Sequence, residues 1–251
     1  MSTDRRKDRI ARAFSSHAGA YDVAADVQWL VAQRLADRIA AGALHPPARV
    51  LEIGCGTGFL SARLAELFPD GALLLTDVAP SMLARCQARL GDRPRYMLLD
   101  GERPEGIAER FDLIGSNLAF QWFVDLKGGL QRLGALLEPG GRLAFATLGK
   151  KTFSEWRAAH HALGLECGTP QYPSMDDFPW PPGLAHAMDE ELVRQPYADG
   201  HDFVRTLKAL GASEPAPGYR PLPPGPFRRL LASLEGGFTV TYHVLYGEIR
   251  A

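Results

Sequence analysis

Cysteine is scarce in this chain, and long apolar runs are absent. The 251 residues include only three cysteines, an odd number with no metal-like spacing. This argues against a disulfide framework and indicates a reducing compartment. No apolar run approaches the length that a transmembrane helix needs. The charged N-terminal stretch also lacks the apolar segment of a secretory signal. We therefore expect a cytoplasmic protein with no metal site and no membrane partner.

An excess of charge of one sign is also missing. The net charge of −1 gives no electrostatic reason to expect binding to nucleic acid or to a membrane surface. With 46% hydrophobic and 23% charged residues, the chain can bury a large core. Its length suits one α/β domain with an added layer. We interpret the local basic clusters as solvated faces; they are Arg5, Arg6, Lys7, Arg9 and Arg12, then Lys150 with Lys151, and Arg228 with Arg229.

Helix-like and strand-like segments alternate through the first 150 residues. Apolar residues at steps of three and four predict a helix over 21–42, ended by Gly42 and the Pro46-Pro47 pair. Further strands are predicted at 49–54, 72–77, 94–100, 111–117 and 142–148, and helices at 59–68, 79–90 and 126–141. Because these strands are apolar throughout, they indicate a mostly parallel sheet covered on both faces, which is a doubly wound α/β fold.

The pattern changes after Lys151. Residues 167–183 are rich in proline, aspartate and glycine, and we interpret them as a loop or lid. Short helices are predicted at 200–212 and 226–237. Residues 238–250 alternate and are rich in β-branched and aromatic side chains, so they predict a strand. We expect this last strand to add to the sheet edge in antiparallel orientation.

The stretch LEIGCGTG, residues 51–58, places three glycines between a predicted strand and a predicted helix. Glycine in such a turn permits a tight backbone and lets a ligand come close to it. The spacing of Gly54, Gly56 and Gly58 is G-x-G-x-G, which differs from the dinucleotide fingerprint, and no phosphate-binding Lys-Ser/Thr pair follows. Glu52 lies two residues before the first glycine. Glycines that serve only a structural turn would look the same, so the surrounding residues must distinguish a ligand-binding loop from such a turn.

Polar residues recur where the predicted strands end. Asp77 ends the second strand, where its carboxylate could accept both ribose hydroxyls of an adenosine. Asp100, followed by Gly101, ends the third strand, where a carboxylate could accept from an adenine amino group. Asn117 follows the fourth strand. Open α/β sheets bind ligands at this edge. Each acid alone would fit a helix cap or a solvated turn, but the set favours a nucleoside site.

The segments LEIGCGTG, TDVAPSML, LLDGERP and FDLIGSNLAFQW resemble the motifs of the class I S-adenosylmethionine-dependent methyltransferases. This resemblance implies that Glu52 and the three glycines hold the methionine moiety of the cofactor, that Asp77 holds the ribose, and that Asp100 lies at the adenine. Val78 and Met82 would pack on the base. The cofactor-binding set is then Glu52, Gly54, Gly56, Gly58, Asp77, Val78, Met82, Asp100, Gly101 and Asn117.

Segments outside these motifs are similar to the malonyl-acyl carrier protein O-methyltransferases of biotin synthesis. They are RIARAFSSHAGAYDVAADVQ, SNLAFQW, TLKALGAS and TYHVLYGEI, and the likeness runs from about residue 10 to residue 249. It implies methylation of the free carboxylate of a malonyl thioester on acyl carrier protein, with malonyl-coenzyme A as a possible alternative substrate. Two other functions stay open: methylation of another small carboxylate or small acceptor, and an assembly factor that binds S-adenosylmethionine without transferring its methyl group. The oligomeric state also stays open.

The sequence indicates the residues that contact the methyl acceptor less clearly than those that bind the cofactor. Tyr21 could close over the cofactor and place its hydroxyl near the carboxylate. Gln121 could donate to a carboxylate oxygen, and Trp122 could exclude water. A contact at a helix start would explain Gln121 equally well, and core packing would explain Trp122.

A cation that holds the carboxylate is expected but not assigned. The possible cations are Lys208, which leads because it lies in the matched segment TLKALGAS, and Arg205, Lys150 and His243. His243 is more simply a satisfied core or edge histidine. Trp29, Trp156 and the His160-His161 pair are more simply packing or surface residues. Because carrier proteins are acidic, a basic rim is also expected, from Arg228 and Arg229 or from Lys150 and Lys151.

Together these features predict one methyltransferase domain in four parts. The parts are an N-terminal helical cap over 1–45, a cofactor-binding core over 46–150, a lid and substrate region over 151–235, and a terminal strand over 236–251.

Overall fold

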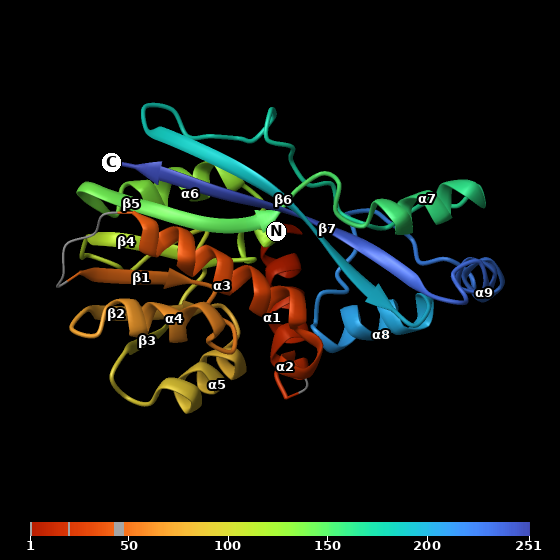
Figure 1. The fold of residues 1–251 in the computed structure, drawn as a ribbon, viewed down its shortest axis with the longest axis horizontal. Helices are drawn as coiled ribbons and strands as arrows, with labels where there is room; N and C mark the ends of the chain where they lie inside the picture. Colours follow the sequence, from red (N-terminus) through yellow and green to blue (C-terminus); the bar gives the residue numbers. More distant parts are fainter. Residues whose placement is uncertain (1, 20, 43–47) are drawn as a thin grey trace.

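Seven strands form one sheet in the computed structural model, which describes residues 2–19, 21–42 and 48–251 (Figure 1). The order across the sheet is β3-β2-β1-β4-β5-β7-β6. The first five strands of this order are parallel, and β7 is antiparallel to both β5 and β6. The strands are β1 (Arg49–Ile53), β2 (Ala72–Asp77), β3 (Arg95–Leu98), β4 (Phe111–Asn117), β5 (Leu137–Leu148), β6 (Ala185–Tyr197) and β7 (Phe238–Arg250).

Helices cover both faces of this sheet. They are α1 (Ser2–His17), α2 (Tyr21–Ala24), α3 (Asp26–Ala41), α4 (Phe59–Leu67), α5 (Pro80–Leu90), α6 (Leu126–Gly134), α7 (Ser154–Ala162), α8 (Gly200–Ala209) and α9 (Pro224–Ala232), with a short 3₁₀ turn, η1 (Phe120–Trp122). Apolar residues of α3, α4 and α5 share one buried cluster with the sheet. Apolar residues of α6 and η1 belong to a second cluster on the other face. The predicted doubly wound α/β fold is therefore confirmed.

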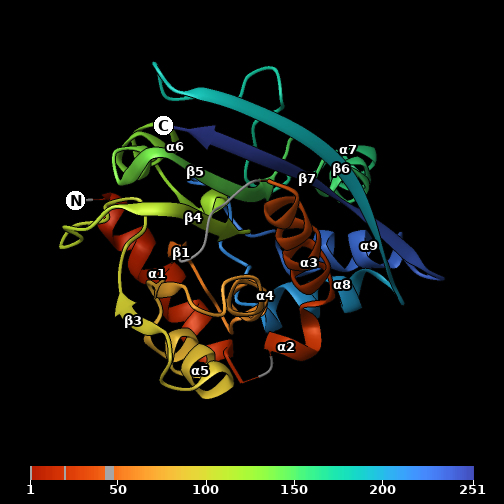
Figure 2. The same ribbon diagram turned by 60° about the vertical axis from the view of Figure 1, so that its left-hand side comes forward.

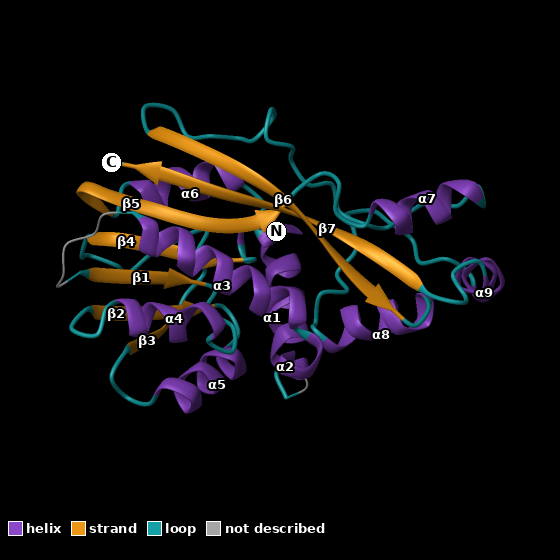
Figure 3. Ribbon diagram, in the orientation of Figure 1, coloured by secondary structure: helices purple, strands orange, loops and turns teal. Residues whose placement is uncertain are grey.

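Strands β6 and β7 continue past the end of their neighbour β5. The two strands pair along their full length, from Ala185 with Arg250 to Tyr197 with Phe238. By contrast, β5 pairs with β7 only from Val244 onward. The remaining ends form a two-stranded ribbon, and α7, α8 and α9 gather around it (Figures 2 and 3). Residues 151–235, the predicted lid and substrate region, include strand β6 of this ribbon and the three helices around it.

The predicted helix over 21–42 is two helices in the structure. It breaks at Ala25 and ends at Ala41, with Gly42 as its C-cap. The Pro46-Pro47 pair lies outside the described residues. The predicted helix over 126–141 is also shorter, because α6 ends at Gly134 and β5 begins at Leu137.

Besides the short turn η1, three elements were not predicted. Helix α1 lies in a segment that the sequence showed only as polar, and α7 follows Phe153 directly. Strand β6 lies in the expected lid region, and it corrects one prediction: β7 is antiparallel as expected, but β6 and not β7 forms the sheet edge. Most side chains of β6 are exposed, so its sequence shows no apolar face. No helix among the described residues is long and apolar enough to cross a membrane.

Replacing Phe203 tests whether its ring anchors α8 to the ribbon. The buried ring lies 5.2 Å from the Phe153 and Tyr197 rings and 5.3 Å from the Trp156 ring, between centroids. We expect Phe203→Ala to lower the free energy of unfolding by about 3–5 kcal/mol, because it leaves a cavity. Denaturant titration measures this loss. Leu192→Ala, at a half-exposed position of β6, is the control and should change stability by less than about 0.5 kcal/mol.

Candidate functional site

The loop between β1 and α4 has a backbone that requires its glycines. Gly54, Gly56 and Gly58 have φ angles of 70°, 55° and 95°, in the left-handed region. A Cβ at Gly54 would also come within 2.5 Å of the Ala119 Cβ. The glycines therefore allow the loop to turn tightly at the carboxyl end of β1, where the backbone faces a cavity.

The carboxylate of Asp77 ties this loop to the end of β2. Its Oδ2 accepts from the Gly56 N–H at 2.9 Å, and its Oδ1 accepts from the Ala79 N–H at 2.8 Å. Burial raises the pKa of Asp77, although these N–H groups oppose the shift. Asp77 thus holds the glycine loop and the start of α5 in fixed positions while it faces the cavity.

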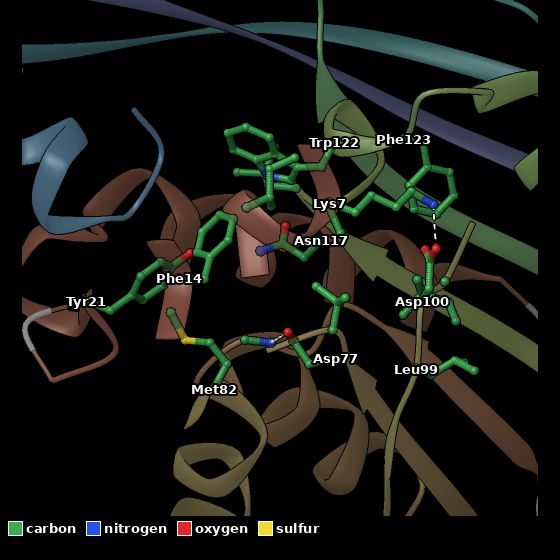
Figure 4. Close-up of a pocket in the computed structure, with 18 residues that line it drawn as sticks. Lys7, Phe14, Tyr21, Asp77, Met82, Leu99, Asp100, Asn117, Trp122 and Phe123 are labelled. Carbon is green, nitrogen blue, oxygen red and sulfur yellow. Dashed lines mark hydrogen bonds and ion pairs between the residues drawn. The ribbon is translucent and has the colours of Figure 1, made fainter. Parts of the chain in front are cut away.

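One cavity collects most of the predicted cofactor-binding residues. Its empty volume is about 770 Å³, including its solvent-filled mouth. Asp77, Asp100 and Asn117 lie around it at the ends of β2, β3 and β4, and Tyr21 and Trp122 close it from the other side (Figure 4). The predicted residues that line it are Gly54, Gly56, Asp77, Val78, Met82, Asp100, Gly101 and Asn117, together with Tyr21 and Trp122. We call it the cofactor cavity.

Glu52, in β1, and Gly58, at the end of the loop, do not line the cavity. Glu52 is 1% exposed, and its Oε2 has no hydrogen-bond partner in the described part of the chain. Burial raises the pKa of Glu52 well above its ordinary value. A buried acceptor without a partner is costly. The ammonium and sulfonium of S-adenosylmethionine are positive, so two buried acids beside the cavity fit that cofactor well. Asp77 likewise offers the carboxylate that ribose hydroxyls need.

Helix α1 closes the cofactor cavity and adds a residue that the sequence did not single out. Lys7 Nζ lies 2.5 Å from Asp100 Oδ2 and 3.0 Å from Glu102 Oε2 (Figure 4). The interpretation of the N-terminal basic cluster as a solvated face is therefore wrong for Lys7, which lines the cavity. Arg9 of the same helix pairs with Glu214 at 2.6 Å. The partners are 93 and 205 residues away in the chain, so no local pattern could indicate these pairs.

Helix α2 places Tyr21 over the same cavity. The next residue, Asp22, accepts from Thr57 Oγ1 of the glycine loop at 2.6 Å and pairs with Arg89 of α5 at 2.5 Å. The Tyr21 ring centroid lies 6.4 Å from that of Phe14. Burial raises the pKa of Tyr21, and Asp77 and Asp22 raise it further. Its hydroxyl therefore keeps its proton and acts as a hydrogen-bond donor.

A smaller inner pocket adjoins the cofactor cavity. Phe14, Tyr21, Leu118 and Trp122 line both spaces. Gln121 lines the inner pocket only; its Nε2 donates to the Leu118 carbonyl at 2.5 Å, and its Oε1 accepts from Thr147 at 3.3 Å. The adjacent residues Gln121 and Trp122 therefore meet at the inner pocket, and Trp122 also reaches the cofactor cavity.

The proposed cations lie away from these two spaces. Lys208 lines a third space, here called the outer groove, between α7, α8 and α9. Arg205 pairs with Asp202 at 3.3 Å on the exposed side of α8. His243 is buried and bonded, with Nε2 2.6 Å from Glu190 Oε2 and Nδ1 accepting from the Lys151 N–H, which confirms the packing interpretation. Among the described residues that line the cofactor cavity, Lys7 supplies the positive charge, and the inner pocket has no lysine or arginine.

The other aromatic and basic residues considered from the sequence divide between packing and exposure. Trp156 packs against the rings of His160 and Phe203, as the packing interpretation expected. Trp29 is 52% exposed on α3. Of the basic pairs expected to form a rim, Lys151 pairs with Glu190 at 3.1 Å.

Glu52→Gln tests the buried acid through stability alone. Because the pKa of Glu52 is raised on folding, the native protein keeps a proton that the unfolded chain releases near its ordinary pKa. The stability that this proton gives is present below the unfolded pKa and is lost as pH rises toward the folded pKa. We expect the free energy of unfolding to fall less between about pH 5 and about pH 8 in Glu52→Gln than in the unaltered protein.

Denaturant titrations at the two pH values measure this difference. Glu235→Gln, at an exposed position, is the matched control and should leave the pH dependence unchanged. An identical pH dependence in Glu52→Gln and in the unaltered protein would show that Glu52 carries its charge at no cost.

Solved structures with the same fold include methyltransferases. The chain aligns with the YcgJ protein of Bacillus subtilis at a TM-score of 0.60 and 13% identity, over 87% of this chain and 98% of that one. It aligns with the plantazolicin methyltransferase BpumL, solved with a desmethylPZN analog and SAH, at a TM-score of 0.53 and 14% identity, over 99% and 98% of the two chains. At these identities the likeness shows the fold alone.

Sequence relatives are more specific. A methyltransferase domain family matches residues 51–143. The biotin biosynthesis bifunctional protein BioCD of Bordetella avium is 43% identical over 96% of this chain, which spans 52% of that longer protein. The malonyl-[acyl-carrier protein] O-methyltransferase of Magnetococcus marinus is also 43% identical, over 96% of this chain and 92% of that protein. The chain therefore belongs to the malonyl-[acyl-carrier protein] O-methyltransferase family.

Proposed function

We propose that this chain transfers the methyl group of S-adenosylmethionine to the free carboxylate of a malonyl thioester on acyl carrier protein. Two relatives, each 43% identical over 96% of the chain, carry names for this reaction or for biotin synthesis. The observation that carries the proposal most is the inner pocket. It adjoins the cofactor cavity and offers neutral hydrogen-bond donors in place of lysine or arginine.

The cofactor cavity would hold the methyl donor through residues of four strand ends. S-adenosylmethionine, when bound, supplies a positively charged sulfonium with an activated methyl group. Asp77 would accept from the ribose hydroxyls, and Asp100 would accept from the adenine amino group after exchanging part of its contact with Lys7. Glu52, which keeps its proton in the protein alone, would release that proton beside the positive charge of the cofactor and then counter this charge.

The inner pocket would hold the acceptor without a base. A malonyl carboxyl is already ionised at neutral pH, so no group has to remove a proton from it. Tyr21 keeps its hydroxyl proton because its pKa is raised, and it would donate to one carboxylate oxygen. Gln121 uses one amide hydrogen on the Leu118 carbonyl, which leaves the other free to donate. These two donors would orient the carboxylate for in-line attack.

The absence of a cation from the described lining of the inner pocket suits this reaction. An oxygen–carbon bond forms as the sulfur–carbon bond breaks, and a carboxylate and a sulfonium become a neutral ester and a neutral thioether. Charge is lost in the transition state, so a pocket that excludes water favours the reaction. A lysine or arginine paired with the carboxylate would stabilise the charged reactant instead. Phe14 and Trp122, with ring centroids 5.5 Å apart, wall this pocket with aromatic surface.

Replacing Asp77 tests the cofactor part of the proposal. We expect Asp77→Ala to weaken S-adenosylmethionine binding by more than about 1 kcal/mol, because a charge-assisted hydrogen bond is lost and Gly56 loses its acceptor. Calorimetric titration gives the dissociation constant. Asp70→Ala, at an exposed turn, is the control and should bind as the unaltered protein does. Unchanged affinity in Asp77→Ala would contradict the ribose assignment.

The reaction itself is tested by methyl transfer to defined acceptors. We expect label from radioactive S-adenosylmethionine to appear on malonyl-acyl carrier protein and not on acetyl-acyl carrier protein, because only the malonyl group offers a free carboxylate. Mild base should release the label, as it does from an ester. Malonyl-coenzyme A, tested beside them, measures how strictly the carrier is required.

The other functions predict different outcomes of the same assay. Label on another small carboxylate, with none on the malonyl thioester, would move the proposal to that acceptor. Tight cofactor binding without label on any acceptor would favour an assembly factor.

A further inference from the structure

The outer groove is the largest feature of the site that the reaction above does not use. It lies between α7, the loop around Thr169, α8 and α9. Its walls are mainly apolar or aromatic, with hydroxyl groups among them; they include Trp156, Thr169, Tyr172, Leu207, Tyr219 and Phe227. It also adjoins the inner pocket, because Trp122, Phe153, Tyr172, Leu207 and Ala212 line both. Trp122 lines all three spaces, so they form one series from the cofactor outward.

Backbone strain marks both junctions of this series. Leu118 and Phe153 are the non-glycine residues with left-handed φ angles in the described chain, at 51° and 61°. Leu118 lines the cofactor cavity and the inner pocket, and Phe153 lines the inner pocket and the outer groove. Such conformations cost about 1–3 kcal/mol each and cluster where a site needs them. Both strained residues therefore fall on the path between the cofactor and the groove.

The charges along the groove are unequal. Glu214 lines it, but its carboxylate pairs with Arg9 of α1 at 2.6 Å. Lys208 also lines it and is exposed to solvent. An exposed ammonium group thus lies beside apolar walls, an arrangement that suits a long neutral ligand with an anionic end.

We propose that the outer groove binds the pantetheine arm that carries the malonyl thioester, and that Lys208 contacts the phosphate at the far end of that arm. This inference rests on the proposed function. A malonyl carboxylate beside the methyl donor leaves its thioester in the inner pocket, and the arm can then continue into the outer groove, which shares five lining residues with that pocket. The hydroxyls of Thr169, Tyr172 and Tyr219 can bond the amides of the arm. Lys208 then acts far from the carboxylate that it was first considered to hold.

Truncated substrates test the groove with the unaltered protein. The series is malonyl-phosphopantetheine, malonyl-pantetheine and a malonyl thioester with a short alkyl thiol. Removing the phosphate alone, from malonyl-phosphopantetheine to malonyl-pantetheine, should lower kcat/KM for methyl transfer by about five-fold, as for one solvent-exposed charge pair. Removing the rest of the arm, from malonyl-pantetheine to the short thioester, should lower kcat/KM by about ten-fold or more, because the groove contacts are lost. Equal values for all three substrates would overturn the proposal.

Matched lysine variants separate the phosphate contact from general charge. In Lys208→Gln, kcat/KM for malonyl-phosphopantetheine should fall by about five-fold to the value for malonyl-pantetheine, which should itself be unchanged. Lys127→Gln, at an exposed position of α6, is the matched control and should retain the preference for the phosphorylated arm. Retention of that preference in Lys208→Gln would contradict the assignment of Lys208.

A filled groove gives a second test. Ala212 lines the junction of the inner pocket and the groove. We expect Ala212→Trp to lower kcat/KM for malonyl-phosphopantetheine by about ten-fold or more, with less effect on the short thioester. Calorimetric binding of S-adenosylmethionine shows whether the variant keeps its fold.

Direct binding distinguishes a failure of this inference from a failure of the proposed function. Phosphopantetheine without a malonyl group is titrated into the unaltered protein and into Lys208→Gln. Weaker binding to the variant supports the groove assignment even where no malonyl thioester is methylated. Equal binding to both proteins, together with active methyl transfer, overturns the assignment and leaves the proposed function in place.

Discussion

The bridge that Asp77 makes between Gly56 and Ala79 holds the site together. One carboxylate fixes the glycine loop after β1 and the start of α5 after β2, and it still faces the cavity. The protein bears a cost for this, because burial raises the pKa of both Asp77 and Glu52. A positive ligand beside the cavity would lower both pKa values again and favour the ionised carboxylates. The same arrangement that fixes the loop therefore favours a cationic cofactor over a neutral or anionic one.

The N-terminal helices depend on this loop in turn. Asp22 of α2 accepts from Thr57, so the glycine loop helps to position Tyr21, which also packs against the buried residues Ala79 and Met82. Helix α1 reaches two sites at once, because Lys7 pairs with Asp100 at the cofactor cavity and Arg9 pairs with Glu214 at the outer groove. Most of these contacts are polar and lie near solvent, and such pairs contribute little to stability individually. They fix the position of the cap more than they strengthen the fold.

The sequence could predict those elements whose burial leaves a pattern of apolar residues within the element itself. Strands such as β1 and β2 are buried on both faces, so their apolar runs and the acids that end them are visible locally. The edge strand β6 is mostly exposed and polar, and it resembles a loop in sequence. Helix α1 buries few apolar side chains, Ile10 among them, which gives too weak a periodicity to predict it. The pairing of Lys7 with Asp100 depends on tertiary structure alone, so it had no local signal.

The helices around the ribbon beyond β5 form walls of the outer groove, apart from the strand ends at the cofactor cavity. A two-stranded ribbon is marginal alone, and here it is stabilised by rings that α7 and α8 press against it. The Phe203 ring lies 5.7 Å from Phe238, and the Phe153 ring lies 5.1 Å from Tyr242, between centroids. These contacts need apolar bulk on the inner side of the helices only. Their outer sides and the intervening loops are free to change, so the outer groove can change without disturbing the strand ends at the cofactor cavity.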